Sequence, residues 1–438
     1  MPYENERSKM KKLFNLLIGL VLVNASFAQD TLDIFQCFNA MEKNYPKAVE
    51  KELIKEQTEY KLQNIKAEWF PSLDVNVQAS YQSDVVEVNL GNQLPFPVDF
   101  PTASKDQYKA TLDVKQMIYD GGAIQSSKKA EHLNSSIQQQ FVEIDLYKVK
   151  EQISQVYFGV LLLQKQKDIL EATLNELDKK TESVQAGVRN GALLPSDLQS
   201  IKAEKISLVQ NMDEIERNID AYIQMLNEFT GLGLKKDIIF SLPEFQFDSL
   251  TDFKRPENEL FDLQKSQLSA NKKQVKSQKM PKVFAFGQAG YGKPGLNMLQ
   301  DEFDSFYILG AKLSWNLWDW STNKRQRNQL EVQKQIVDVQ QETFNNRIKV
   351  KIDQIQSDID NYKMSLERDK EIIDLREQVI SSARSKLENG VITSSEYISD
   401  LNKLKKARIT CEQHKVELIK SKLDYLLVSG NLINHKNQ

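Results

Sequence analysis

The sequence is poor in the residues that build metal centres and disulfide frameworks. It has 438 residues but only 2 Cys and 3 His, which leaves little material for either kind of site. Lys and Arg (58) nearly balance Asp and Glu (61), so a basic face for nucleic acid is not expected. Gly (16) and Pro (11) are also scarce, which favours long uninterrupted elements. Composition alone therefore predicts a mainly helical, elongated chain that is not an enzyme and holds no cofactor or metal.

Long apolar runs are also missing. No stretch approaches 18 consecutive apolar residues, so no membrane-spanning helix is predicted. Residues 1–28 have the pattern of a signal peptide: Lys11 and Lys12 precede a short apolar run, and small residues at Ser26 and Ala28 mark cleavage. We therefore expect an exported protein.

Two stretches of the chain have the spacing of long amphipathic helices. Through residues 122–191 and 321–390, apolar residues recur in steps of three and four, which is typical of helices that pack side by side. The stretches end at Gly191 and Gly390, which are 199 positions apart. We therefore predict duplicated helices, each roughly 100 Å long at 1.5 Å per residue. A returning helix follows each glycine, so each repeat is predicted to be a helical hairpin.

A pair of segments with alternating apolar and polar residues precedes each predicted hairpin. Their length, about nine to twelve residues, suits a tilted strand that crosses a bilayer. Phe284 and Phe286 break the alternation in one segment because they fall on its polar phase. A half-buried sheet in a soluble protein has the same alternation, and that interpretation stays open. The segments are 73–82, 108–115, 282–292 and 307–317.

The tryptophans gather at the helix-side ends of these predicted strands. Such a distribution is expected of an aromatic girdle at a membrane interface. Four strands cannot close a barrel, and an open edge in lipid would leave backbone groups without partners. The strands must then be pooled between chains, which predicts an oligomer. The predicted girdle consists of Trp69, Trp315, Trp318 and Trp320.

In their order and duplication, several short motifs make the sequence similar to the TolC-type outer membrane efflux proteins, also called outer membrane factors. The similarity covers nearly the whole exported chain. The motifs are Trp69-Phe70-Pro71, Tyr119-Asp120-Gly121-Gly122, Trp315-Asn316-Leu317-Trp318-Asp319, Gly191-x3-Pro195-x-Asp197 and Gly390-x5-Glu396.

The resemblance implies a fold and a set of partners. It implies a homotrimer in outer-membrane lipid, in which each chain gives four transmembrane strands to one twelve-stranded barrel. The helices would form a periplasmic tunnel that meets a periplasmic adaptor (membrane fusion) protein and an inner-membrane transporter. The implied function is an exit duct for tripartite efflux or type I secretion, with no nucleic-acid partner.

The resemblance also implies site residues at the hairpin tips. Asp197 and Glu396 would line a periplasmic entrance, or gate, as rings of carboxylates that favour cations. The alternative is that both are solvated acids in the first turn of a helix, where the helix dipole favours them. Residues expected to contact the adaptor are Gly191, Leu194, Pro195, Gly390, Ile392 and Ser394.

One departure from the family concerns the gate. Members can carry a Tyr and an Arg at the second tip that tether the closed state, whereas this chain has Leu387 and Ile392 there. We therefore expect apolar packing or other contacts to hold the tip closed.

The predicted fold class is α+β, mainly α, with internal duplication. A soluble periplasmic coiled-coil scaffold or adaptor protein is the alternative function, because strand pairs can also form a small β-domain. The predicted domains are a signal peptide (1–28), an N-terminal helical segment (29–70), a first strand pair with an external loop (71–120), a first hairpin (121–230), a linker (231–257), a helix (258–280), a second strand pair (281–320), and a second hairpin with the C-terminal tail (321–438).

Overall fold

The computed structural model describes residues 31–86, 104–245, 253–298 and 300–432, so the predicted signal peptide and most of the first external loop lie outside it. The chain divides into two compact units, each described by itself. The strand unit takes its described residues from Glu50–Glu143 and Pro256–Phe344. The tip unit takes them from Met1–Val49, Ile144–Arg255 and Asn345–Gln438.

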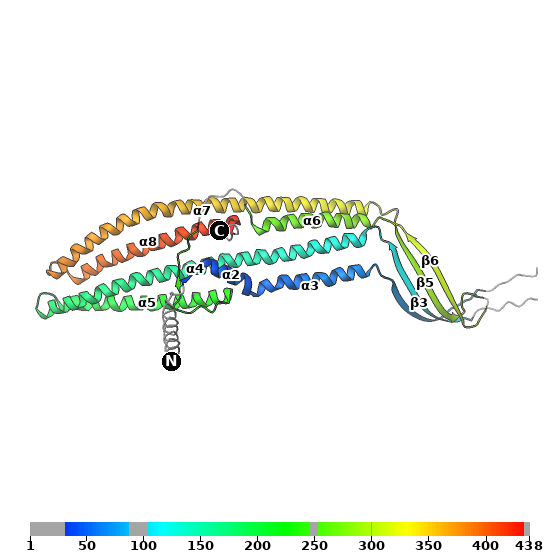
Figure 1. The fold of residues 1–438 in the computed structure, drawn as a ribbon, viewed down its shortest axis with the longest axis horizontal. Coiled ribbons are helices and arrows are strands. Elements are labelled where there is room, and N and C mark those ends of the chain that lie inside the picture. Colours follow the sequence, from blue (N-terminus) through cyan, green and yellow to red (C-terminus); the bar gives the residue numbers. More distant parts are fainter. Residues whose placement is uncertain (1–30, 87–103, 246–252, 299, 433–438) are drawn as a thin grey trace, which may run out of the picture. The chain divides into compact units, whose positions relative to one another are not determined.

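The strand unit contains one antiparallel sheet (Figure 1). The strands run in the order β2, β3, β5, β6, so β2 and β6 are the edges. Leu317 was predicted to continue the last strand, and this is wrong: β6 ends at Ser314, because its partner β5 begins opposite it at Lys282. The strands are β2 (Ser72–Tyr81), β3 (Asp106–Tyr119), β5 (Lys282–Lys293) and β6 (Asp304–Ser314).

The strand register produces one continuous apolar face across the sheet. Val75 of β2 lies opposite Leu112 of β3, which lies opposite Ala289 of β5, which lies opposite Tyr307 of β6. Since side chains alternate between faces, every second residue of each strand shares this face. The apolar phases that the sequence predicted for separate strands therefore coincide.

The two phenylalanines that broke the predicted alternation lie on the opposite, polar face. The Phe286 ring covers Gly310 of β6, where an added Cβ would lie 2.7 Å from the ring. The ammonium group of Lys115 lies 4.4 Å from the centre of the Phe284 ring, a cation–π contact. These rings therefore pack against a glycine and a lysine of neighbouring strands.

The long helices match the predicted duplication. α4 (Ala123–Arg189) and α7 (Thr322–Glu388) each have 67 residues, and the returning helices α5 (Pro195–Thr230) and α8 (Ser394–Ser429) each have 36. An aspartate caps each long helix: Asp120 accepts from the N–H of Ile124 at 2.6 Å, and Asp319 from that of Asn323 at 3.0 Å. The strand unit also holds α6 (Pro256–Ser277) and most of α3 (Pro46–Ala67).

The turn before each long helix repeats the same backbone shape with different residues. Gly121 and Gly122 have φ angles of 70° and 84°, and their equivalents Trp320 and Ser321 have 52° and 63°. Glycine adopts this left-handed region readily, whereas other residues do so at a cost. A side chain is excluded at Gly121 because its Cβ would overlap Met280. The second repeat thus retains the turn but uses one position to present a tryptophan.

In the tip unit, β1 (Thr31–Leu32) and β4 (Ile239–Phe240) form a short parallel pair. Helix α2 (Ile34–Asn44) follows β1. The buried hydroxyl of Tyr157 lies 2.7 Å from the carbonyl oxygen of Leu32 and 2.6 Å from that of Ser241. Cys37 and Cys411 are buried and free, so they form no disulfide in this structure. Within the described residues, no helix has the length and apolar character needed to cross a membrane.

Candidate functional site

The first hairpin turns at Gly191, whose φ of 71° ends α4. Pro195 opens α5, where its missing N–H costs no hydrogen bond. The Asp197 carboxylate accepts from the backbone N–H of Leu194 at 3.1 Å. Leu194 has no side-chain acceptor to return that bond, so only half of a capping box forms. Its side chain is 64% exposed.

The second hairpin turns at Gly390, with a φ of 67°, and forms the complete box. The Glu396 carboxylate accepts from the N–H of Thr393 at 2.8 Å, and the Thr393 hydroxyl accepts from the N–H of Glu396 at 3.3 Å. Glu396 is exposed. Both predicted gate acids therefore lie in the first turn of a returning helix, as the alternative interpretation also expected.

Asp197 makes a contact that its counterpart lacks. Its second carboxylate oxygen accepts from the backbone N–H of Ser394, the first residue of α8, at 2.7 Å. The Asp197 side chain is only 7% exposed. One carboxylate thus caps two helices that belong to different repeats. Sequence reasoning missed this link, because nothing in the spacing indicates which part of one tip meets the other.

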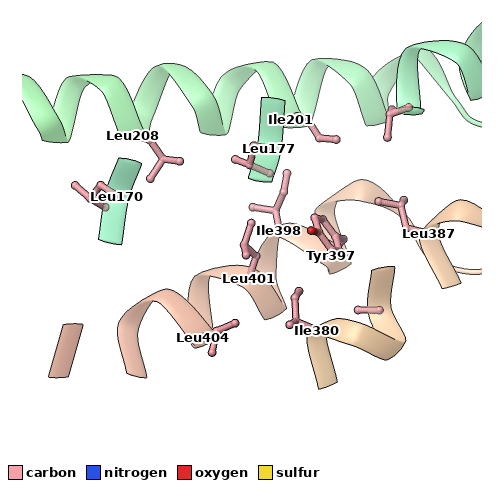
Figure 2. Close-up of a cluster of buried hydrophobic side chains, with 12 residues drawn as sticks. Leu170, Leu177, Ile201, Leu208, Ile380, Leu387, Tyr397, Ile398, Leu401 and Leu404 are labelled. Atoms are coloured by element: carbon pink, nitrogen blue, oxygen red, sulfur yellow. The ribbon is translucent and has the colours of Figure 1, made fainter. Parts of the chain in front are cut away.

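An apolar core packs the two tips together (Figure 2). Leu177 of α4 and Ile201 of α5 lie near Ile398 and Tyr397 of α8, and all four are in one buried cluster. Leu387, where the sequence suggested apolar packing, is 1% exposed within this cluster. Ile392, predicted to contact an adaptor, packs partly buried against the same cluster.

Charged groups surround this core and also join the two repeats. The Glu176 carboxylate of α4 accepts from the guanidinium of Arg384 in α7 at 2.6 Å and from the Tyr397 hydroxyl at 2.7 Å. One turn further, Lys180 pairs with Glu388. The tip is therefore held by ion pairs as well as by apolar packing, although the residues differ from those of the family tether.

This cluster shifts the ionisation of its members. Burial opposes the charge of Glu176, but the hydrogen bonds from Tyr397 and Arg384 outweigh it and leave the pKa of Glu176 below its ordinary value. Burial raises the pKa of the Tyr397 hydroxyl, and its bond to the Glu176 carboxylate raises it further. At neutral pH the cluster is a carboxylate held by one cation and one neutral donor.

A hollow of about 430 Å³ opens between α7 and α8 beside the second tip. Ile392 and Glu396 both line it. Ser394, by contrast, is fully buried, and its hydroxyl has no hydrogen-bond partner among the described residues. The residues predicted to contact an adaptor thus differ widely in access: Leu194 is open to solvent and Ser394 is enclosed.

The predicted tryptophan girdle lies in the strand unit. Trp69 precedes β2, and the other three follow β6, between that strand and α7. The indole N–H of Trp315 donates to the carbonyl oxygen of Lys279 at 3.1 Å, and Trp318 and Trp320 meet edge to face. All four side chains are at least 42% exposed.

Among the described residues, no group of three or more His, Cys, Asp or Glu could hold a metal ion.

Comparison with known proteins bears directly on this architecture. Residues 46–204 match the family model described as "Outer membrane efflux protein". The predicted resemblance to this family is confirmed. The match also confirms the predicted outer-membrane location with a periplasmic helical part. No curated protein matches the chain in sequence.

Solved outer-membrane channels share the fold. The Campylobacter jejuni CmeC channel is 15% identical, with a TM-score of 0.66 over 91% of this chain and 85% of that one. The Vibrio cholerae outer membrane protein VceC is 15% identical, with a TM-score of 0.65 over 91% and 96%. The open state of the Neisseria gonorrhoeae MtrE channel is 13% identical, with a TM-score of 0.65 over 91% and 89%. The predicted mainly helical α+β fold class is confirmed.

Proposed function

We propose that this outer membrane efflux protein is the exit duct of a tripartite efflux or type I secretion system. As a homotrimer, it would pool its strands into one barrel in outer-membrane lipid. A periplasmic adaptor and an inner-membrane transporter would deliver substrates to its helical tunnel. Its own role would be passive conduction of those substrates.

The sheet of the strand unit carries this proposal. Its edge strands β2 and β6 have no partner strands within the described chain. Apolar side chains on the shared face are open: Val77 is 80% exposed and Leu309 is 76% exposed. A soluble sheet would bury such a face, whereas lipid would cover it. Unpaired edges are costly in lipid, so β2 of one chain needs β6 of another. The same reasoning disfavours the soluble scaffold.

An exposed seam on α7 supports the oligomer. Val332, Ile336 and Val339 follow one another in steps of four and three, and each is at least 51% exposed. This spacing places them on one side of the helix, a seam suited to a neighbouring helix. Exposed apolar residues on α3, such as Leu53 and Tyr60, offer a complementary surface on a second copy.

Cysteine cross-linking between the edge strands tests the shared barrel. Cys37 and Cys411 would first be replaced by Ser. Each variant would then carry one new cysteine in β2, at Val75 or Val77, and one in β6, at Leu309 or Ala311. We expect oxidation in outer membranes to give a ladder that ends at a trimer. The matched control places cysteines at Leu112 and Ala289, which lie opposite each other within one chain. Their oxidation should give monomers only. Monomers from every edge pair would contradict the proposal.

The two tip acids, in this proposal, form the entrance. In a trimer each acid would recur three times around the tunnel axis, and such rings favour cations. The Asp197 bond to Ser394 would break when the hairpins separate, which frees a carboxylate for the pore. Replacing both Asp197 and Glu396 with Ala should weaken cation selectivity in single-channel recordings. Unchanged selectivity would remove the gate role and leave the fold untouched.

The adaptor would dock on the exposed parts of the tips. The hollow beside Ile392 and Glu396 can receive a side chain, and Leu194 and Val391 stand open at the two turns. Photo-cross-linking from position 194 in cells should capture the adaptor. A probe at buried Ser394 is the matched control and should capture it only when the tip opens.

A further inference from the structure

Lysine side chains surround a hollow on the helices of the strand unit. The hollow has a volume of about 350 Å³, and a second of about 330 Å³ adjoins it and shares Lys129, Ala270 and Lys273. Two serines of α6, Ser266 and Ser269, add hydroxyl groups. The other lysines that line it are Lys265 of α6 and Lys334 of α7.

Hydrogen bonds between the helices fix this gathering of charge. Gln274 of α6 donates to the Ser127 hydroxyl of α4 at 2.9 Å, which brings Lys129 to the level of Lys273. On the other side, Lys272 pairs with Glu331 at 2.7 Å, and Lys265 with Asp338 at 3.5 Å. Those two ion pairs bracket Lys334 along α7. Three helices thus present ammonium groups to one hollow.

The charge of this region is not balanced locally. Segments 123–137, 262–279 and 322–338 contain eleven Lys and Arg residues but only four acidic ones, which are Glu131, Asp262, Glu331 and Asp338. Acidic side chains already hold Lys265. Lys129, Lys273 and Lys334, however, have no acidic group within ion-pair distance in the described chain. On α7, the buried Nε–H of Arg327, two turns before Lys334, likewise has no acceptor there.

We propose that this lysine hollow binds a phosphate-bearing anion. Lysine is a compact charge that suits phosphate oxygens, and serine hydroxyls can donate to the same group. Lys273 lies four residues before the end of α6, and β5 begins five residues after that end, at Lys282. A lipid phosphate at the membrane interface and a soluble phosphate compound would present the same chemistry. The inference does not require the duct, and only the lipid source depends on the strands being in a membrane.

The test measures binding to the purified full-length protein in detergent. One arm adds phosphatidylglycerol or phosphatidylcholine and counts retained lipids by native mass spectrometry. The other titrates inorganic pyrophosphate by calorimetry. The test variant carries Lys129→Gln, Lys273→Gln and Lys334→Gln. The matched control carries Lys66→Gln, Lys276→Gln and Lys324→Gln, which removes the same charge from exposed lysines that do not line either hollow. A third variant, with Lys129→Arg, Lys273→Arg and Lys334→Arg, keeps the positive charge at the hollow.

The expected result is a loss of about tenfold or more in anion affinity in the test variant. The control and the arginine protein should stay close to the wild type. If the test variant loses the wild type's preference for phosphatidylglycerol over phosphatidylcholine, the hollow binds a lipid phosphate. If it instead loses pyrophosphate binding, the hollow binds a soluble phosphate compound. The proposal is overturned if the wild type binds neither probe, or if the test and control variants behave alike.

Discussion

The two hairpin tips carry equivalent acids in very different surroundings. Asp197 and Glu396 are 199 positions apart and both cap the first turn of a returning helix. Asp197 is buried and also holds the start of α8, whereas Glu396 is exposed and bonds only within its own turn. Duplication has preserved the local motif, and packing between the repeats has given one copy a second task. Equivalent positions in a repeat protein therefore need not have equivalent energetics.

The apolar core should give the largest difference between the tips. Leu387→Ala removes a side chain that is 1% exposed, and we expect the free energy of local opening to fall by about 2–5 kcal/mol. Its equivalent in the first repeat, Val188, is only partly buried, so Val188→Ala should cost about 1 kcal/mol. Hydrogen exchange of the tip amides measures both values. Equal losses would mean that the two repeats share the core evenly.

Removal of the shared cap should come next. Asp197→Ala leaves the N–H groups of Leu194 and Ser394 without their acceptor, so a loss of about 2–3 kcal/mol in tip stability is expected. Asp197→Asn is the control, since its amide oxygen can still accept one bond. Hydrogen exchange should record faster opening at the starts of both α5 and α8. Faster exchange in α5 alone would contradict the link between the repeats.

Acid should weaken the tip through Glu176. The pKa of Glu176 is lowered in the folded protein, so its contribution is complete above the ordinary value of 4.5 and is lost as the pH falls through the lowered value. We expect amide protection at the tip to be steady from neutral pH downward and to drop only once the pH falls below the ordinary pKa of 4.5. Glu176→Gln retains an acceptor but cannot titrate, so the difference between the two profiles isolates this group. If amide protection falls with pH in the same way in the wild type and in Glu176→Gln, the acid sensitivity of the tip does not come from Glu176.

Much of the fold could be predicted from the sequence, because its signals are local. Steps of three and four, closed by Gly191 and Gly390, predicted the long helices. Alternation predicted the strands, although it extended one to Leu317. The Glu176 cluster and the Asp197 link could not be predicted, since they depend on how two hairpins meet. Sequence spacing describes each hairpin separately and carries no information on which side chains face across the gap.

Glu396 should give the smallest effect. Glu396→Ala removes one half of a capping box on an exposed turn, and the Thr393 hydroxyl still caps the helix. We therefore expect a loss of about 0.5–1 kcal/mol, confined to the first turn of α8. A double variant with Asp197→Ala sharpens the comparison. If the acids act independently, the two losses measured by hydrogen exchange should add within a few tenths of a kcal/mol. A larger combined loss would mean that the Glu396 cap also holds the Ser394 N–H in place for Asp197, so that the two tips form one cooperative unit.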